Sequence, residues 1–320
     1  MPGTKMPMEA YGSLCTHSKE VCLVPSRGRE EMREVRCMWP VAAELGEGPI
    51  WSASEGAVWF VDIKGRRVHR FHAETGDRQS WAAPDQVSFI LPAGEKSFVA
   101  GLPGRLARFV PVTGAFEPIL NLEGEPPGNR LNDACLDASG CVWFGSMDDN
   151  EKDANGALYF WDGIAAPIAC EQGFVISNGP AHSPDGKTLY HTDTVNRTIF
   201  RYDVATGGFL SGKRALIEIE ENAGWPDGTV VDADGCLWIG LYGGSAVRRY
   251  SPDGALREVV TLPCSLVTKV ALGGSDLRTA FITTARKGLT QAELAAQPLA
   301  GGLFAFNVDV PGCDNVATNP

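Results

Sequence analysis

Six short strings of apolar, β-branched and aromatic residues recur along this 320-residue chain at nearly constant spacing. The strings are AVWFVDI at 57–63, SFVAGL at 97–102, CVWFGSM at 141–147, TLYHTDT at 188–194, CLWIGLY at 236–242 and TAFITTA at 279–285. Successive strings start 40, 44, 47, 48 and 43 residues apart. A second strand-like string follows each, and a turn signal such as SPDGK or DADG precedes most of them, as tight hairpins require.

Repeats of about 45 residues, built of strand pairs and lacking a convincing amphipathic helix, predict an all-β fold, a six-bladed β-propeller. A β-sandwich rarely repeats at a fixed period, and a β-helix has a shorter repeat. The segment REVRCMWPV at 33–41 has no partner of its own. We therefore expect it to add a strand to the last blade and close the ring, which removes exposed sheet edges.

The repeats place the propeller domain at 32–320 and leave residues 1–31 outside it. The first 31 residues mix Pro, Gly, Ser and charge without periodicity, so we expect a disordered extension, with Met32 as an alternative start. They also lack the apolar stretch of a secretory signal, which predicts a cytoplasmic protein.

Charge and cysteine usage exclude several classes of function. Lys and Arg number 28 against 39 Asp and Glu, a net charge of −11, which argues against nucleic acid and membrane partners. No apolar run reaches the roughly 18 residues of a membrane span. The nine cysteines form no CxxC pair, so we expect reduced thiols rather than disulfides or a zinc site. No obligatory protein partner is evident.

Four polar motifs recur at one phase of the repeat, about ten residues ahead of the strings above. They are LGEGPIW at 45–51, NRLNDA at 129–134, ISNGPAHS at 176–183 and WPDGTVVD at 225–232. Since the innermost strands of a propeller line its channel, we expect their polar side chains to meet at one mouth. Each such residue alone is more often an ordinary turn residue, and the recurrence is what favours a site. Glu47, Asn178 and Asp227 together offer three hard oxygen ligands for one divalent metal ion such as Ca, Mg, Mn or Fe(II).

These motifs, with WFGSM and YHTDT downstream, resemble the gluconolactonase and senescence-marker (regucalcin-type) family along residues 33–310. The blocks DQVSF and TTARKGLT…PLAGG resemble its bacterial sugar-lactonase branch, including xylonolactonases. The resemblance implies hydrolysis of a sugar aldonolactone (glucono-, xylono-, arabinono- or galactonolactone) and adds Zn to the candidate metals. It makes Glu47, Asn178 and Asp227 the metal ligands.

The same resemblance implies that Arg130 and Asn132 contact the substrate. A third contact in the family is a Glu whose position falls near Asn150 here, which departs from the family pattern. For the reaction we assign Asp227 as the general base and expect Arg130 to orient hydroxyls or stabilise the oxyanion. Trp225 is expected either to stack on the sugar or to pack at the rim.

Other functions stay open at this stage. A metal-dependent esterase or phosphotriesterase would use the same scaffold, and a calcium-binding propeller without catalysis is the non-enzymatic alternative. A serine nucleophile is not predicted, because there is no G-x-S-x-G motif. His182 and His191 are expected to be structural, and Trp51 to pack between blades. Asp193 and Lys269 could also face the channel, but the sequence does not orient them.

Overall fold

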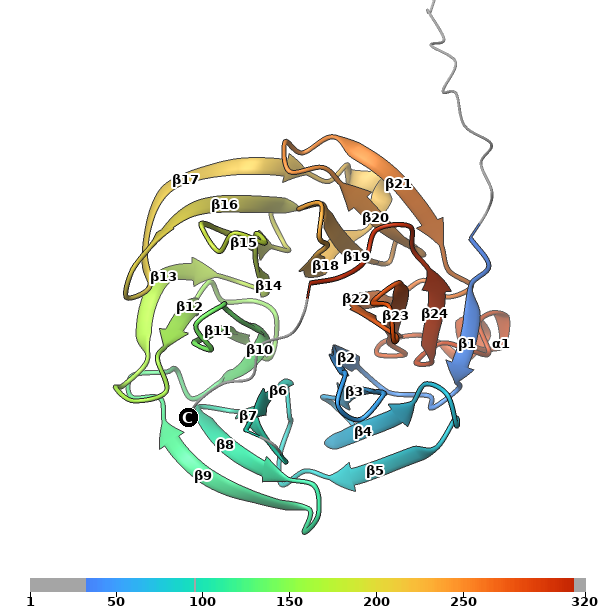
Figure 1. The fold of residues 1–320 in the computed structure, drawn as a ribbon, viewed down its shortest axis with the longest axis horizontal. Helices are drawn as coiled ribbons and strands as arrows, with labels where there is room; N and C mark the ends of the chain where they lie inside the picture. The colour runs from blue at the N-terminus through green and yellow to red at the C-terminus, as the bar shows by residue number, and fades with distance from the viewer. Residues whose placement is uncertain (1–32, 95, 314–320) are drawn as a thin grey trace, which may run out of the picture. The chain divides into compact units, whose positions relative to one another are not determined.

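The computed structural model describes residues 33–94 and 96–313, so the extension predicted at residues 1–31 lies outside the described residues. The described strands form six four-stranded antiparallel sheets. These sheets are arranged as blades around a central axis (Figure 1). The predicted all-β six-bladed β-propeller is therefore confirmed.

The first three blades each take their strands in sequence order from the axis outwards. Blade 1 contains β2 (Gly46–Ser52), β3 (Ala57–Asp62), β4 (Arg67–His72) and β5 (Arg78–Ala82). Blade 2 contains β6 (Phe89–Ala93), β7 (Ser97–Leu102), β8 (Arg105–Val110) and β9 (Ala115–Asn121). Blade 3 contains β10 (Asn129–Leu136), β11 (Val142–Asp148), β12 (Gly156–Trp161) and β13 (Ile168–Phe174).

Blades 4 and 5 repeat this order, and blade 6 is completed by the first strand of the chain. Blade 4 contains β14 (Ser177–His182), β15 (Thr188–Asp193), β16 (Thr198–Ala205) and β17 (Phe209–Glu218). Blade 5 follows the 3₁₀ helix η1 (Glu221–Ala223) and contains β18 (Trp225–Val231), β19 (Leu237–Tyr242), β20 (Ala246–Tyr250) and β21 (Leu256–Thr261). Blade 6 contains β22 (Val267–Gly273), β23 (Thr279–Thr284), β24 (Leu303–Asn307) and β1 (Arg36–Trp39).

The ring closes as the sequence predicts. Strand β1 pairs antiparallel with β24, with Arg36 opposite Ala305 and Cys37 opposite Phe304. The segment 33–41 thus supplies the outermost strand of the last blade. Strand β1 covers the edge of β24 in this way. Because β1 directly precedes blade 1 in the sequence, the pairing also joins the start of the propeller to its last blade.

The core lies between neighbouring blades. All six residues of β3 are buried, because a second strand is covered on both faces, whereas the outermost strand β5 is largely exposed. Trp51 stacks on Phe281 of blade 6 with ring centroids 5.6 Å apart, so its predicted packing between blades is confirmed. Trp59 contacts Phe98 of blade 2 with tilted rings, whose centroids are 4.7 Å apart. Each buried aromatic contributes about 1.5–3 kcal/mol.

The turn that precedes β19 shows how the repeat encodes its hairpins. The Asp232 carboxylate accepts the backbone N–H groups of Asp234 and Cys236, each at 3.0 Å, and the indole N–H of Trp238 at 3.0 Å. Gly235 completes the turn at φ +79°, a conformation that other residues adopt at a cost. The equivalent turn of blade 3 has the same arrangement. Aspartate and glycine at these positions therefore fix the start of the second strand.

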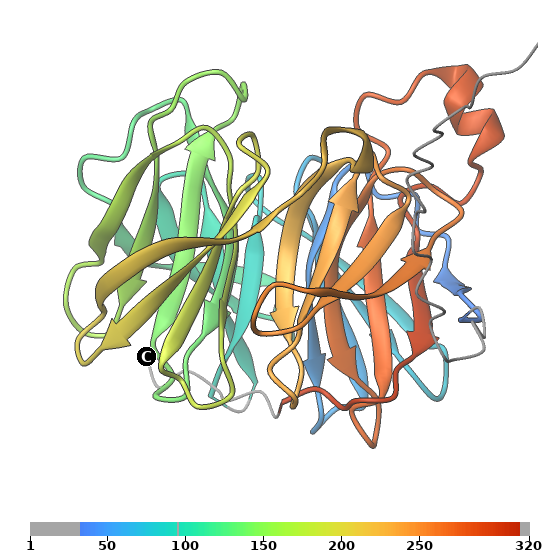
Figure 2. The same cartoon turned by 90° about the horizontal axis from the view of Figure 1, so that it is seen from above.

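A short helix, α1 (Gln291–Ala296), lies in the connection between β23 and β24 and stands above the strands in Figure 2. Thr290 and Glu293 form a capping box at its start. The repeat pattern does not predict this helix, since six residues with no buried side chain leave no apolar periodicity. Within residues 33–94 and 96–313, no helix has the length and apolar character needed to cross a bilayer.

Candidate active site

The innermost strand of five blades carries a β-bulge at the same place. In each, two residues oppose one residue of the neighbouring strand. The bulges lie between Glu47 and Ile50 of β2, Leu131 and Ala134 of β10, Asn178 and Ala181 of β14, Pro226 and Thr229 of β18, and Val267 and Val270 of β22. A bulge bends the strand and re-aims its side chains. This feature is the physical basis of the recurring polar motifs.

A cavity of about 230 Å³ opens at the end of the channel where the bulges lie. It brings together five of the six predicted site residues: Glu47, Arg130, Asn132, Asn178 and Asp227. All five are buried. They come from β2, β10, β14 and β18, so four blades contribute to one site. The remaining wall consists of Leu45, Met147, Glu151, Ile176, Thr194, Val195, Trp225, Tyr242 and Lys287.

Hydrogen bonds fix which way the Asn178 amide points. Its Nδ2 donates to Thr194 Oγ1 at 3.0 Å, and that hydroxyl in turn donates to the Pro226 carbonyl at 2.9 Å. The Oδ1 atom accepts from Asn132 Nδ2 at 2.6 Å and keeps a second lone pair. Asn178 therefore offers a carbonyl oxygen, rather than an NH₂ group, as a ligand on the cavity side.

Two buried carboxylates, Glu47 and Asp227, form no ion pair with a described residue. The only hydrogen bond to the Glu47 carboxylate within the described residues comes from the Gly48 N–H at 3.0 Å, and the Asp227 carboxylate has none there. Burial, followed by the charge of Asp133, raises the pKa of Glu47 from 4.5 to about 7. Burial and the neighbouring Glu47 raise the pKa of Asp227 well above its usual 3.8. The charges of Arg130 and Lys269 offset only part of this effect, so the site holds two incompletely compensated negative charges when both groups ionise.

The Arg130 guanidinium is hydrogen-bonded through Nε and Nη1, whereas its Nη2 has no partner among the described residues. Its Nε donates to Asp149 Oδ1 at 2.9 Å, and its Nη1 donates to Asn132 Oδ1 at 2.5 Å. Asp149 also binds Lys64 and Gln86, so it joins blades 1, 2 and 3. No described residue accepts a hydrogen bond from Nη2 of Arg130. This nitrogen remains available to a bound molecule.

Below these residues, a buried ion pair crosses the channel. Lys269 on β22 donates to Asp133 Oδ1 on β10 and to the Ala134 carbonyl at 3.2 Å. Asp133 Oδ2 accepts the Gly179 N–H at 3.0 Å, directly after Asn178. A Cβ on Gly228 would lie 2.4 Å from the Lys269 stem, so the residue after Asp227 rests on the same pair. The pair therefore supports both the β14 and the β18 bulge from beneath.

The structure places Asn150 outside the cavity. Its Nδ2 donates to Asp148 Oδ1 at 3.3 Å, and its backbone N–H donates to the same oxygen at 3.1 Å. The adjacent Glu151 lines the cavity instead. The one-residue offset arises because Asp148 gathers the loop around its carboxylate, with Glu151 at φ +60°. Sequence spacing alone does not reveal such a turn.

Of the other residues considered in the sequence, Trp225 lines the cavity and the two histidines do not. His191 is fully buried, its Nε2 pairs with Ser177 Oγ at 2.8 Å, and burial lowers its pKa to about 3. His182 packs edge-on against Trp143 away from the cavity. Trp225 does line the cavity, with the Arg197 guanidinium 4.5 Å from its ring centroid. Neither histidine can serve as a base there.

The donor set fits a hard divalent cation. Among the described residues, no three His, Cys, Asp or Glu side chains cluster as a metal-binding group. The set is instead two carboxylates and one amide oxygen, from Glu47, Asp227 and Asn178. Oxygen donors of this kind suit Ca²⁺, Mg²⁺ or Mn²⁺, and a dication supplies the positive charge that Arg130 and Lys269 provide only in part. The residues present therefore fit the predicted ion.

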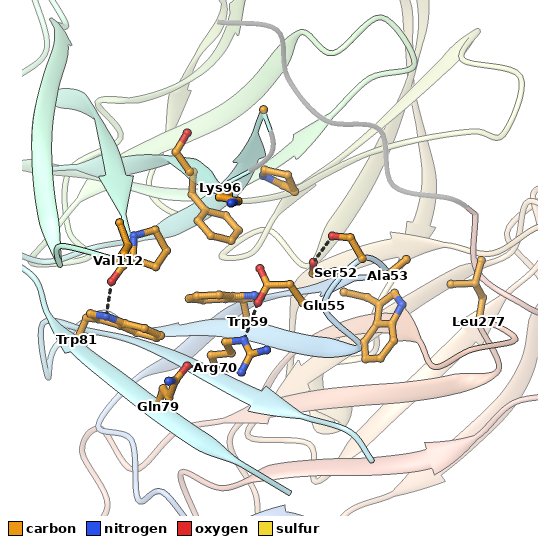
Figure 3. Close-up of a pocket in the computed structure, with 17 residues that line it drawn as sticks. Ser52, Ala53, Glu55, Trp59, Arg70, Gln79, Trp81, Lys96, Val112 and Leu277 are labelled. Carbon is orange, nitrogen blue, oxygen red and sulfur yellow. Dashed lines mark hydrogen bonds and ion pairs between the residues drawn. The ribbon is translucent and has the colours of Figure 1, made fainter. Parts of the chain in front are cut away.

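A larger groove lies between blades 1 and 2 at the opposite ends of their strands (Figure 3). Its floor is aromatic, with Trp59 and Trp81 stacked at 5.1 Å. Its ion pair is internal, since Arg70 Nε donates to Glu55 Oε2 at 2.7 Å. None of the predicted site residues lines it. The chemistry-bearing groups are therefore in the smaller cavity.

Comparison with known proteins gives a consistent result. A sequence model described as the SMP-30/Gluconolactonase/LRE-like region matches residues 45–286. An L-arabinolactonase of Azospirillum brasilense is 35% identical over 81% of this chain and 87% of its own length. A 6-deoxy-6-sulfogluconolactonase of Pseudomonas putida is 31% identical over 87% of this chain and 96% of its own length.

Solved structures agree with the fold. A calcium-binding regucalcin from Agrobacterium tumefaciens superposes with a TM-score of 0.86 at 27% identity, covering 90% of this chain and 98% of its own. A gluconolactonase from Xanthomonas campestris superposes with a TM-score of 0.71 at 20% identity, covering 87% and 89%. The second likeness concerns the fold alone.

Proposed function

Because the chain belongs to the SMP-30/gluconolactonase/regucalcin family, we propose that it hydrolyses the lactone of a monosaccharide aldonic acid. The reaction takes place in the cavity at the channel mouth and uses one divalent metal ion. The ligands are Glu47, Asn178 and Asp227. The identity of the metal is left open among Ca, Zn, Mn, Mg and Fe(II).

One observation carries this proposal. Glu47 and Asp227 are buried carboxylates that form no ion pair with a described residue, and they share a small cavity with an oriented amide oxygen. A buried charge without a partner is costly, so a protein retains such groups where a ligand compensates them. The same cavity contains Arg130 with a free nitrogen for a polar substrate.

The size of the cavity supports a small substrate. A sphere of 230 Å³ is about 8 Å across, below the range of pockets for drug-sized ligands. One sugar ring fills such a space, whereas an oligosaccharide does not. The arabinolactonase and sulfogluconolactonase named above, together with a pentonolactonase of Haloferax volcanii at 31% identity, act on five- and six-carbon lactones by their names. A pentono- or hexonolactone is therefore the proposed substrate class.

The residues divide the chemistry as follows. When bound, the metal ion would polarise the lactone carbonyl and lower the pKa of a water molecule. Asp227 accepts a proton from the attacking water, whose oxygen forms a bond to the carbonyl carbon. Arg130 Nη2 stabilises charge on the carbonyl oxygen. The ring C–O bond then breaks, and the ring oxygen leaves as a hydroxyl after taking the proton from Asp227.

Asn132 has a different part from the one that the resemblance implies. Its Nδ2 donates to Asn178 Oδ1 and to the Ser177 carbonyl, and its Oδ1 accepts from Arg130. Only one lone pair remains for a sugar hydroxyl. We therefore assign Asn132 first to holding Asn178 and Arg130 in register, and second to accepting one substrate hydrogen bond.

The test is a panel of pentono- and hexonolactones with metal-stripped protein reconstituted with single divalent ions. Acid release above the spontaneous rate is expected with at least one metal, and Asp227→Asn should lower kcat by at least about a hundredfold. A paraoxon-like ester and an aryl ester serve as competing substrates. Faster turnover of either ester, or equal rates with and without metal, would overturn the proposal.

A further inference from the structure

A second ion pair spans the mouth of the cavity. Lys287, in the connection after β23, pairs with Glu151, in the loop after β11. These loops belong to blades 6 and 3, which lie on opposite sides of the ring (Figure 1). Both side chains line the cavity. The pair therefore bridges the opening instead of bordering one side of it.

Both ends of this bridge are anchored through the backbone. The N–H groups of Arg286 and Lys287 donate to the Glu44 carbonyl at 3.0 and 2.9 Å. The Glu151 N–H donates to the Asp148 carbonyl at 3.0 Å. The Asp148 carboxylate binds the backbone N–H groups of the residues on either side of Glu151. Fixed backbones leave only the two side chains to adjust to a ligand.

The charged side chains of the cavity differ in how deeply they are buried. Glu47, Arg130 and Asp227 are each at most 6% exposed, whereas the Lys287 and Glu151 side chains are 30% and 39% exposed. The reacting carbonyl must lie near the deep groups. In a cavity about 8 Å across, the opposite end of one sugar ring, with its exocyclic carbon, then reaches the bridging pair.

The pair is neutral as a whole, and it presents a donor and an acceptor side by side. Hydroxyl groups can donate to Glu151 and accept from Lys287 without breaking the pair. An anionic group at the same place would meet the Glu151 carboxylate, while Lys287 is already paired with Glu151. The other cation of the cavity, Arg130, is more deeply buried, near the reacting carbonyl. Repulsion between two negative charges weakens the binding of an anionic ligand and has little effect on a neutral ligand. Such a contact therefore discriminates between the two ligands.

Resting on the proposed lactonase function, we propose that Lys287 and Glu151 are the specificity-determining residues for the exocyclic end of the substrate. They select lactones that carry neutral hydroxyl groups there. They reject lactones that carry a carboxylate, sulfonate or phosphate at the terminal carbon.

The experiment compares kcat/KM for a hexonolactone with that for the matching lactone that carries a terminal carboxylate. Glu151→Gln leaves Lys287 unpaired and should shift the ratio towards the anionic lactone by about tenfold or more. Lys287→Met leaves Glu151 unpaired and should shift it in the opposite direction. Both shifts should shrink at high salt. The Lys213–Glu171 pair on the outer strands β17 and β13 supplies matched controls, Glu171→Gln and Lys213→Met, with unchanged ratios.

Failure of the two proposals is distinguishable. If the wild type hydrolyses none of the pentono- and hexonolactones, the proposed function is wrong. If it does hydrolyse the neutral lactone, but the ratio stays within twofold in both variants or moves in the same direction in both, the role of the pair is wrong. A variant without turnover is assayed by equilibrium binding of the two intact lactones, where the same opposite shifts in ratio are expected.

Discussion

Replacing Glu47 with Gln should make the free energy of unfolding of the metal-free protein less dependent on pH. In the folded protein, burial and the charge of Asp133 raise the pKa of Glu47 from 4.5 to about 7. The folded state therefore binds this proton more tightly than the unfolded chain does. The stability that protonated Glu47 provides is complete below pH 4.5 and is lost as the pH rises through 7. An uncharged glutamine side chain at this position has no such proton to lose.

The size of the stability change follows from the pKa shift of Glu47. A difference between 4.5 and about 7 corresponds to a loss of roughly 3 kcal/mol of unfolding free energy at high pH. About 2.5 kcal/mol of that loss falls between pH 5 and pH 8. Asp227 shifts in the same direction, so the total loss in the wild type is larger. These amounts are a substantial fraction of the 5–15 kcal/mol typical of whole domains.

The assay is urea unfolding of wild type and Glu47→Gln in EDTA at several pH values. Titrating groups away from the site are shared, so they cancel in the difference between the two proteins. Asp227 does not cancel, because Glu47 raises its pKa, and its own pH-dependent loss of stability becomes smaller in the variant. We expect Glu47→Gln to gain at least about 2.5 kcal/mol relative to wild type between pH 5 and pH 8, since the smaller shift of Asp227 adds to the difference in the same direction. A divalent ion at a concentration that saturates the wild type should stabilise the wild type more than the variant, which keeps only one of the two carboxylate ligands. A difference that is independent of pH would refute the account of two incompletely compensated carboxylates.

Three further predictions follow from the site. Lys269→Met should destabilise the protein by about 3–5 kcal/mol in urea unfolding, because Asp133 would remain buried and charged; adding Asp133→Asn should recover at least half, and no recovery would contradict the pairing. Thr194→Val should weaken metal binding by about tenfold or more in calorimetric titration with little change in Tm, because the Asn178 amide would lose the bond that orients it; unchanged affinity would count against that orientation. Trp225→Ala should raise KM for a sugar lactone by about tenfold and leave Tm nearly unchanged, since the ring is 44% exposed; an unchanged KM would place the ring outside the substrate's path.

Much of the fold is predictable because propeller strands are specified locally. A buried string such as AVWFVDI and the turn before it form a pattern within a short stretch of sequence. This pattern occurs six times at nearly regular spacing. Even the closing strand is visible as a strand-like segment without a neighbour. Helix α1 was missed because a capping box on a six-residue helix leaves almost no periodic signal.

The site is predictable in part for the same reason. Glu47, Asn178 and Asp227 recur beside the bulges, so their phase in the repeat is visible. Lys287 and Glu151 meet across the ring from unrelated loops, and no local pattern encodes that meeting. Thr194 lies in the YHTDT block, but its contact with Asn178 depends on the packing of blade 4. The cytoplasmic location and the nature of residues 1–31 stay predictions.

The closing strand also sets an order of events during synthesis. Arg36 pairs with Ala305, a residue that the ribosome adds 269 positions later. At about 5–20 residues per second, the segment waits for roughly 15–50 seconds before its partner exists. Glu47 follows it by only a few residues, whereas Lys269 and Lys287 belong to the blade that is made last. A nascent chain therefore exposes an unpaired strand until blade 6 emerges, and the ring closes only after nearly the whole propeller has been made.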